Sequence, residues 1–160
     1  MNILKLELTH FGKFHLKTIT FTSGLNIVYG KNEAGKSTIH AFVRSMLFGI
    51  QDTEEGNERY SHYLPWETPH DFCGKMWIKK DDKVYRIERN FLRPQPTVRV
   101  FDDETGESLQ PAKQHLRQIL SGLTETSYLN TICIEQLKSA TDPQLAKELE
   151  DMAVNASQSK

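Results

Sequence analysis

The sequence predicts an α/β fold that combines a mixed β-sheet with an added antiparallel β region. Two observations lead to this prediction. A short apolar run at residues 25–29 enters a glycine-bearing loop at residues 30–37, and an amphipathic helix pattern follows the loop directly. Further along, residues 74–101 alternate apolar and polar side chains, which is typical of antiparallel strands with one solvated face.

The N-terminal strands are predicted from their alternation. Leucines alternate with charged residues over positions 4–8, which predicts a first strand. Residues 14–21 predict a second strand, in which a change of parity near Thr18 suggests a β-bulge. Residues 25–29 are almost continuously apolar, as expected of a buried strand.

One apolar stripe predicts the helix that follows the glycine loop. Its members recur at helical spacing, and Gly49 then marks the expected end of the helix. Residues 51–71 are polar and contain Gly56, Pro65 and Pro69, so we expect a long loop there. The stripe consists of Ile39, Phe42, Val43, Met46 and Leu47.

The second half of the chain begins with a predicted hairpin, whose turn is Asp81–Asp82, and a third strand at residues 97–101. Pro111 predicts the first turn of a helix. A short strand at residues 132–134 and a last helix from Asp142 complete the pattern. We expect residues 1–140 to form one lobe and residues 141–160 to begin a helix or coiled coil with a frayed polar end.

Composition excludes several classes of protein. The chain has 160 residues, a net charge of −1 and two cysteines far apart in sequence, so neither a zinc site nor a disulfide framework is indicated. Neither a signal-peptide pattern nor an apolar stretch of about 20 residues is present, so we expect a cytoplasmic protein that does not span a membrane.

The glycine-bearing loop carries the chemistry. Residues 30–37 fit the pattern G-x-x-x-x-G-K-[ST], a P-loop that binds the phosphates of a nucleoside triphosphate, here expected to be ATP with Mg²⁺. Lys36 would reach the β- and γ-phosphates, and the Ser37 hydroxyl would ligate Mg²⁺. The alternative is a glycine turn before an ordinary helix. The expected nucleotide-binding residues are Gly30, Asn32, Glu33, Ala34, Gly35, Lys36, Ser37 and Thr38.

Several segments together resemble the amino-terminal lobe of SMC-like ABC ATPases, including the SbcC-type DNA repair ATPases. The resemblance lies in residues 11–14 (Phe-Gly-Lys-Phe), 24–30 and 32–38 (Asn-Glu-Ala-Gly-Lys-Ser-Thr). The helix ending Met-Leu-Phe-Gly at residues 46–49 is most similar to the YhaN-like branch. That branch usually begins the loop with Gly-Pro, whereas this chain has Lys31.

The resemblance implies roles for residues outside the P-loop. Lys13 is similar to a position near the nucleotide, and Gln136 to the Q-loop glutamine that contacts Mg²⁺ and the attacking water. Gln136 is thus a candidate catalytic and metal-binding residue, with a solvated loop glutamine as the alternative. Arg59 is similar to arginines near nucleotide or DNA, or else lies on the rim of a mobile loop. The Walker B aspartate, its adjacent glutamate and the signature loop have no counterpart here, so the chain corresponds to half of a head.

The implied activity is ATP hydrolysis in a composite site, with a carboxy-terminal lobe and a second head as partners, and DNA and a nuclease subunit beyond them. A local excess of positive charge predicts DNA contacts at Lys79, Lys80 and Lys83, unless these are ordinary solvated strand residues. Two alternatives remain: a non-catalytic nucleotide-binding partner module and, with less support, a small P-loop kinase. A GTPase is disfavoured because no Asn-Lys-x-Asp motif is present.

Overall fold

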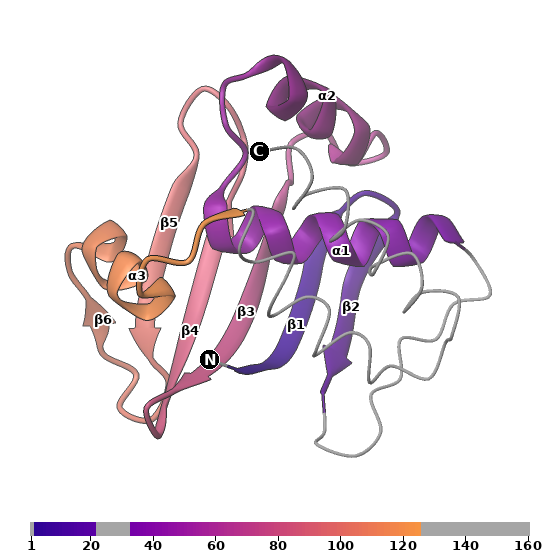
Figure 1. The fold of residues 1–160 in the computed structure, drawn as a ribbon. Helices are drawn as coiled ribbons and strands as arrows, with labels where there is room; N and C mark the ends of the chain where they lie inside the picture. The colour runs from indigo at the N-terminus through magenta and orange to yellow at the C-terminus, as the bar shows by residue number, and fades with distance from the viewer. Residues whose placement is uncertain (1, 22–32, 126–160) are drawn as a thin grey trace, which may run out of the picture.

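The computed structural model describes residues 2–21 and 33–125, and of residues 33–37 it describes the backbone alone. Within these ranges the chain forms one six-stranded sheet with helix α1 lying across one face (Figure 1). The strand order is β2-β1-β3-β4-β5-β6. The elements are β1 (Asn2–Phe11), β2 (Phe14–Thr20), α1 (Glu33–Phe48), α2 (Glu54–Tyr63), β3 (Cys73–Lys80), β4 (Lys83–Asn90), β5 (Thr97–Asp102), β6 (Ser108–Leu109) and α3 (Ala112–Leu120).

Every strand pair in the described part of the chain is antiparallel. The added antiparallel region is therefore present, and it includes the two N-terminal strands as well. The predicted strands at residues 25–29 and 132–134, and the last helix from Asp142, lie outside the described residues. Whether the sheet is mixed depends on those strands, so that part of the fold prediction stays a prediction.

Strand β1 lies inside the sheet, between the edge strand β2 and strand β3 of the described order. Its leucines at positions 6 and 8 are fully buried, as the alternation predicts. The predicted bulge near Thr18 is wrong, because β1 and β2 keep one register from Glu7↔Thr18 to Phe11↔Phe14. The change of parity coincides instead with Leu16, which has a positive φ of 51° and is 71% exposed.

The hairpin between β3 and β4 forms as predicted, with Asp81 and Asp82 as its two-residue turn. Both aspartates have positive φ, 51° and 63°. Positive φ at both central residues matches the twist of the flanking strands, and Asp tolerates this conformation better than most residues that carry a Cβ. Strand β5 also confirms the prediction for residues 97–101.

Helix α1 buries the predicted stripe against the sheet. All of its members are at most 4% exposed, and the ring of Phe42 meets Phe11 of β1 edge-on at 5.1 Å. The helix ends where predicted, since Gly49 has φ +75° and its N–H donates to the Ser45 carbonyl at 2.8 Å. No helix within residues 2–21 or 33–125 is long and apolar enough to cross a membrane.

The prediction of one long loop at residues 51–71 is wrong, because α2 occupies Glu54–Tyr63. Thr53 caps this helix by accepting a hydrogen bond from the Gly56 N–H at 3.0 Å, and two glutamates occupy its first turn. The predicted helix after Pro111 is present as α3. Pro111 serves as its N-cap, one position before the predicted first turn.

Candidate nucleotide site and its surroundings

Helix α1 begins at Glu33, inside the P-loop sequence. The predicted strand–loop–helix order is therefore confirmed on its helical side, with the backbone of Glu33, Ala34, Gly35, Lys36 and Ser37 in the first turns. The first N–H groups of a helix have no partner within it, and the helix dipole favours negative charge at this end. Gly30, Asn32 and the candidate Gln136 lie outside the described residues, so their roles stay predictions.

The turn between β1 and β2 packs against the part of α1 that follows the P-loop. Gly12 has φ +59°, and a Cβ at this position would lie 3.2 Å from Thr38 Cγ2 and 3.4 Å from Tyr63 Cδ1. The Gly12 N–H also donates to the Tyr63 carbonyl at 2.7 Å. Both the close approach and the positive φ favour glycine. Thr38, one of the predicted nucleotide-binding residues, is 8% exposed and lies against this turn.

Lys13 follows Gly12 in the same turn and is exposed. It lines a cavity of about 260 Å³ together with His15, Pro65 and Trp66. The Trp66 side chain is 83% exposed. The structure thus brings the Lys13 turn and Thr38 together, and it places an exposed indole in the same cavity as Lys13. The turn lies between the strands predicted at residues 4–8 and 14–21, whereas the contribution of residues 65–66 required the tertiary structure.

A cluster of charged residues on one side of α1 was not predicted. Arg44 Nε donates to Glu125 Oε2 at 2.8 Å, and its Nη2 lies 3.0 Å from Glu55 Oε1. The same Glu55 oxygen lies 3.3 Å from Arg59 Nη2, and the Arg59 side chain is only 10% exposed. Arg59 is therefore held on a helix, and the alternative of a rim residue on a mobile loop is wrong. Burial, followed by Arg44 and Arg59, lowers the pKa of the buried His40 to about 4.

The available signal for this cluster was the spacing of His40 and Arg44, which stand one helical turn apart on α1. It could not indicate that Glu55 and Glu125 approach from other parts of the chain. His40 is thus a neutral imidazole beside two guanidinium groups, whose positive charges are matched in number by the carboxylates of Glu55 and Glu125.

The three candidate DNA-binding lysines have different environments. Lys80 Nζ donates to the carbonyls of Gln118 and Ile119, both at 2.8 Å, and also contacts Ser121 Oγ, so it caps the C-terminal end of α3. Lys83 is registered opposite Lys80 and lies 3.7 Å from a carboxylate oxygen of Asp102. Lys79 is exposed. Because it is adjacent to Lys80 in β3, its side chain lies on the opposite face of the sheet from that of Lys80.

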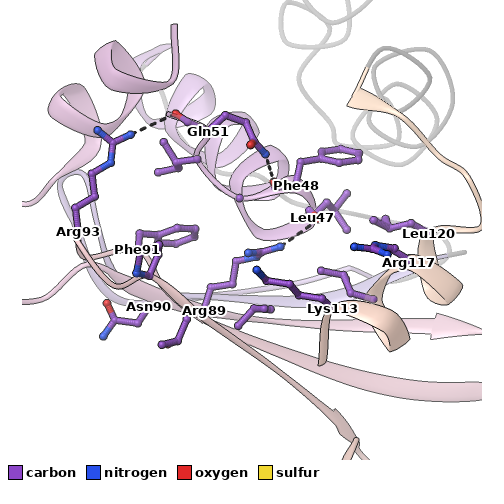
Figure 2. A pocket seen from close by; sticks show the side chains of 16 residues that line it. Leu47, Phe48, Gln51, Arg89, Asn90, Phe91, Arg93, Lys113, Arg117 and Leu120 are labelled. Atoms are coloured by element: carbon purple, nitrogen blue, oxygen red, sulfur yellow. Dashed lines mark hydrogen bonds between the residues drawn. The ribbon is translucent and has the colours of Figure 1, made fainter. Parts of the chain in front are cut away.

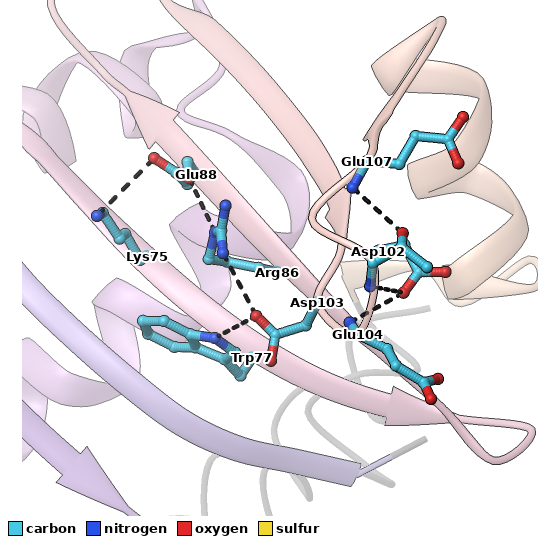
Figure 3. Close-up of polar contacts among 9 residues, drawn as sticks. Lys75, Trp77, Arg86, Glu88, Asp102, Asp103, Glu104 and Glu107 are labelled. Carbon is cyan, nitrogen blue, oxygen red and sulfur yellow. Dashed lines mark hydrogen bonds and ion pairs between the residues drawn. The ribbon is translucent and has the colours of Figure 1, made fainter.

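Much of the positive charge between residues 75 and 99 is paired within the sheet (Figure 3). Arg86 Nε lies 2.9 Å from Glu88 Oε2, and its Nη1 lies 3.4 Å from Asp103 Oδ1. Lys75 stands 4.0 Å from Glu88, while the indole N–H of Trp77 donates to Asp103 at 3.1 Å. The net positive charge at this surface is thus smaller than the number of basic residues in the sequence suggests. Acidic side chains from β4 and the end of β5 lie among the basic ones.

The part of the chain that the structure describes contains no group of three or more His, Cys, Asp or Glu side chains that could hold a metal ion. The predicted Mg²⁺ ligands, a serine and a glutamine, are of other residue types. The side chain of Ser37 and all of Gln136 are beyond what the structure describes, and the remaining ligands would come from nucleotide phosphates and water.

Two curated proteins are similar to this chain. The protein named "Uncharacterized protein YhaN" of Bacillus subtilis is 41% identical over 56 residues, which cover 34% of this chain and 6% of that protein. The "DNA double-strand break repair Rad50 ATPase" of Thermococcus kodakarensis is 25% identical over 137 residues, which cover 85% of this chain and 15% of that protein. The chain therefore spans only a small part of the length of the relatives it matches.

A protein-family model described as "AAA domain" matches residues 1–151. The match includes the P-loop sequence, all described elements and the segment that contains Gln136. Together with the two relatives, it agrees with the resemblance to the N-terminal region of SMC- and SbcC-like ATPases. The chain belongs to this AAA domain family.

Proposed function

We propose that this chain is the ATP-binding N-terminal lobe of an SMC- or Rad50-type ATPase. The observation that carries the proposal is the position of the P-loop sequence directly at the start of α1, in a chain matched by the AAA domain over residues 1–151. The Rad50 ATPase relative has an activity of this kind by its name and aligns with most of this chain.

The described geometry is suited to binding phosphate. Because α1 begins at Glu33, its free N–H groups and the positive end of its dipole lie where the loop would hold the β- and γ-phosphates. Lys36 is proposed to neutralise phosphate charge there. The hydroxyl of Ser37 is the oxygen ligand that Mg²⁺ prefers, and Mg²⁺ would supply charge stabilisation when bound. Lys13 would approach the nucleotide from the turn that packs on Thr38.

Hydrolysis is proposed to need groups from outside these 160 residues. The sequence contains no signature loop and no continuously apolar strand run that ends in Asp-Glu, since Arg99 interrupts the run before Asp103 and Glu104. The general base and the γ-phosphate contacts would come from a carboxy-terminal lobe and a second head, with Gln136 positioning water. DNA and a nuclease subunit are proposed partners of the complete assembly, and the Rad50 relative's name supports the link to DNA repair.

The alternative of a non-catalytic nucleotide-binding module differs from this proposal in one respect only, the lack of turnover in any assembly. A small P-loop kinase has less support. Within the described residues, α1 is followed by the single helix α2 and then by the antiparallel β3–β4–β5 meander, rather than by the lid helices expected of such a kinase.

A calorimetric titration with Mg²⁺–ATP tests the proposal on the 160-residue chain. We expect one site that Lys36→Ala abolishes, while the melting temperature without nucleotide stays nearly unchanged. Lys17→Ala is the matched control, because Lys17 is an exposed lysine on β2, far in sequence from the P-loop. Equal ATP affinity in the parent and Lys36→Ala would overturn the assignment.

A further inference from the structure

A second pocket lies at the C-terminal end of α1, opposite the P-loop end of the same helix (Figure 2). The β4–β5 connection and α3 complete its walls, and its volume is about 480 Å³. Four of the residues that line it are basic and none is acidic. Since α1 has 16 residues and is about 24 Å long, this pocket is separate from the predicted ATP site.

Arg89 forms the floor of the pocket. Its Nε donates to the Met46 carbonyl at 2.6 Å and its Nη2 to the Leu47 carbonyl at 3.4 Å, so it caps the end of α1. Gly49 makes room for the guanidinium, because a Cβ there would lie 3.3 Å from Arg89 Nη1. Burial lowers the pKa of Arg89 to about 10, and the group therefore remains protonated at neutral pH. Carbonyl dipoles compensate this charge, and no carboxylate among residues 2–21 and 33–125 pairs with it.

Lys113 and Arg117 bring two more positive charges to the same place. They stand one turn apart on α3, where like charges destabilise a helix by a few tenths of a kcal/mol. Figure 2 shows their side chains directed toward the part of the pocket that Arg89 occupies. Among the described residues, neither side chain makes a hydrogen bond or an ion pair, and α3 contains no acidic residue. Three cations thus converge, and no described residue supplies a counter-charge.

Arg93 supplies a fourth positive charge at the far end of the pocket. Its Nη1 donates to Asn57 Oδ1 at 2.6 Å and its Nη2 to the Gln51 carbonyl at 3.3 Å, while the guanidinium lies 4.5 Å from the centre of the Tyr60 ring. All of these partners are neutral. Between the two charged ends the walls are largely apolar, formed by Phe91, Val98, Leu116 and Leu120 among others.

We propose that this pocket binds a phosphate group, carried either by a nucleotide-sized molecule or by a nucleic-acid strand, with Arg89, Lys113 and Arg117 as its ligands. A tetrahedral phosphate accepts hydrogen bonds from several directions and carries more negative charge than a carboxylate, so it matches three converging cations better. The volume suits a small ligand, since such pockets usually measure about 300–1,000 Å³. The apolar walls would receive its base or another apolar part.

The test uses the 160-residue chain carrying Lys36→Ala, so that the P-loop does not contribute and the result does not depend on the proposed ATP site. The probes are pyrophosphate, AMP and a fluorescein-labelled single-stranded 15-mer, each titrated at low salt. The ¹⁵N signal of Arg89 Nε should shift on binding. The double variant Lys113→Gln/Arg117→Gln should weaken binding at least tenfold, because two charge-assisted contacts are lost.

The matched control is Lys17→Gln/Arg99→Gln, which removes the same charge from exposed positions outside the pocket. We expect this control to keep the affinity of the parent for pyrophosphate and AMP. Saturable binding of these two probes with no gain for the 15-mer identifies a small phosphorylated ligand. Binding confined to the 15-mer, sensitive to the pocket variant, identifies a strand. The proposal is overturned if the pocket variant and the control bind every probe alike, or if none of the three probes binds.

Discussion

The ring of Phe42 on α1 lies directly over Gly74 of β3. A Cβ added to Gly74 would stand 2.2 Å from Phe42 Cε1 and 3.1 Å from the Glu7 carbonyl oxygen. Both residues are buried, so neither can move into solvent to relieve the contact. The absence of a side chain at position 74 therefore sets how closely α1 approaches the sheet, and with it the position of the P-loop end of the helix.

Gly74→Ala should destabilise the chain by about 1–3 kcal/mol, the usual cost of overpacking a core. Denaturant unfolding followed by circular dichroism measures this loss. Phe42→Leu provides the matched background, because it removes the ring atoms nearest to the new methyl group. In that background Gly74→Ala should cost less, although the Glu7 carbonyl still limits the relief. An equal cost in both backgrounds would show that Phe42 is not the residue that excludes the methyl group.

Stability should fall as the pH drops from about 6.5 toward 4, because His40 stays neutral in the folded chain. Burial, then Arg44 and Arg59, lower its pKa from 6.5 to about 4. The unfolded chain therefore binds the proton first, and the stability present above pH 6.5 is lost as the pH falls through this window. The loss from this residue approaches roughly 3 kcal/mol. It is measured as the slope of unfolding free energy against pH.

His40→Gln should flatten the slope of unfolding free energy against pH by the amount that corresponds to about one bound proton. His70→Gln, at an exposed position, should leave the slope as it is in the parent. Matching slopes in the parent and His40→Gln would assign the acid sensitivity to other groups.

Periodicity predicted α1 well, because a helix packed on a sheet must bury one stripe, and all members of the predicted stripe are buried. It missed α2, whose only buried residue is Gly56. That helix is held by contacts far apart in sequence, including Tyr63 stacked on Phe11 and Tyr60 against Phe72. The local signals that were available were the Thr53 cap and the glutamates after it.

The two candidate sites also differ in how far the sequence alone predicts them. A contiguous motif such as residues 30–37 can be identified from sequence, since its chemistry depends on neighbouring backbone groups. The charges around Arg89 could not be grouped in advance, because Lys113 and Arg117 reach the pocket only after α3 has docked. The sheet also pairs Arg86 with Asp103, which a count of basic residues along the chain cannot reveal.

Lys80→Met should lower the free energy of unfolding by about 1–2 kcal/mol, because the ammonium group bonds the last carbonyls of α3. Lys79→Met, one residue away and exposed, should change it by less than about 0.5 kcal/mol. Chemical denaturation of the two variants gives the comparison. Equal effects would show that Lys80 is an ordinary surface lysine.

The DNA-binding prediction is then best tested with Lys79→Glu/Lys83→Glu, which leaves this cap intact and should weaken DNA binding most at low salt.

The 160-residue chain should bind ATP without turning it over. The groups of a phosphoryl-transfer site act as a unit, and this sequence has neither a continuously apolar strand run that ends in Asp-Glu nor a signature loop. A steady-state phosphate-release assay measures the rate. Adding a carboxy-terminal lobe as a separate chain should restore turnover, and Gln136→Ala should then lower the rate while sparing most ATP binding. Rapid turnover by the chain alone, abolished by Lys36→Ala, would show that these residues already form a complete enzyme.

The position of β1 beside β3 has a consequence for how the chain folds. Strands β3 and β4 are joined by two residues, so their pairing closes a very short loop. Strand β1 pairs with β3 through His10 and Cys73, and this contact encloses all of β2, α1 and α2. The entropy lost on closing a loop rises with its length, and non-local pairings slow folding. The β3–β4–β5 meander is therefore expected to form early, and the pairing of β1 with β3 to form late.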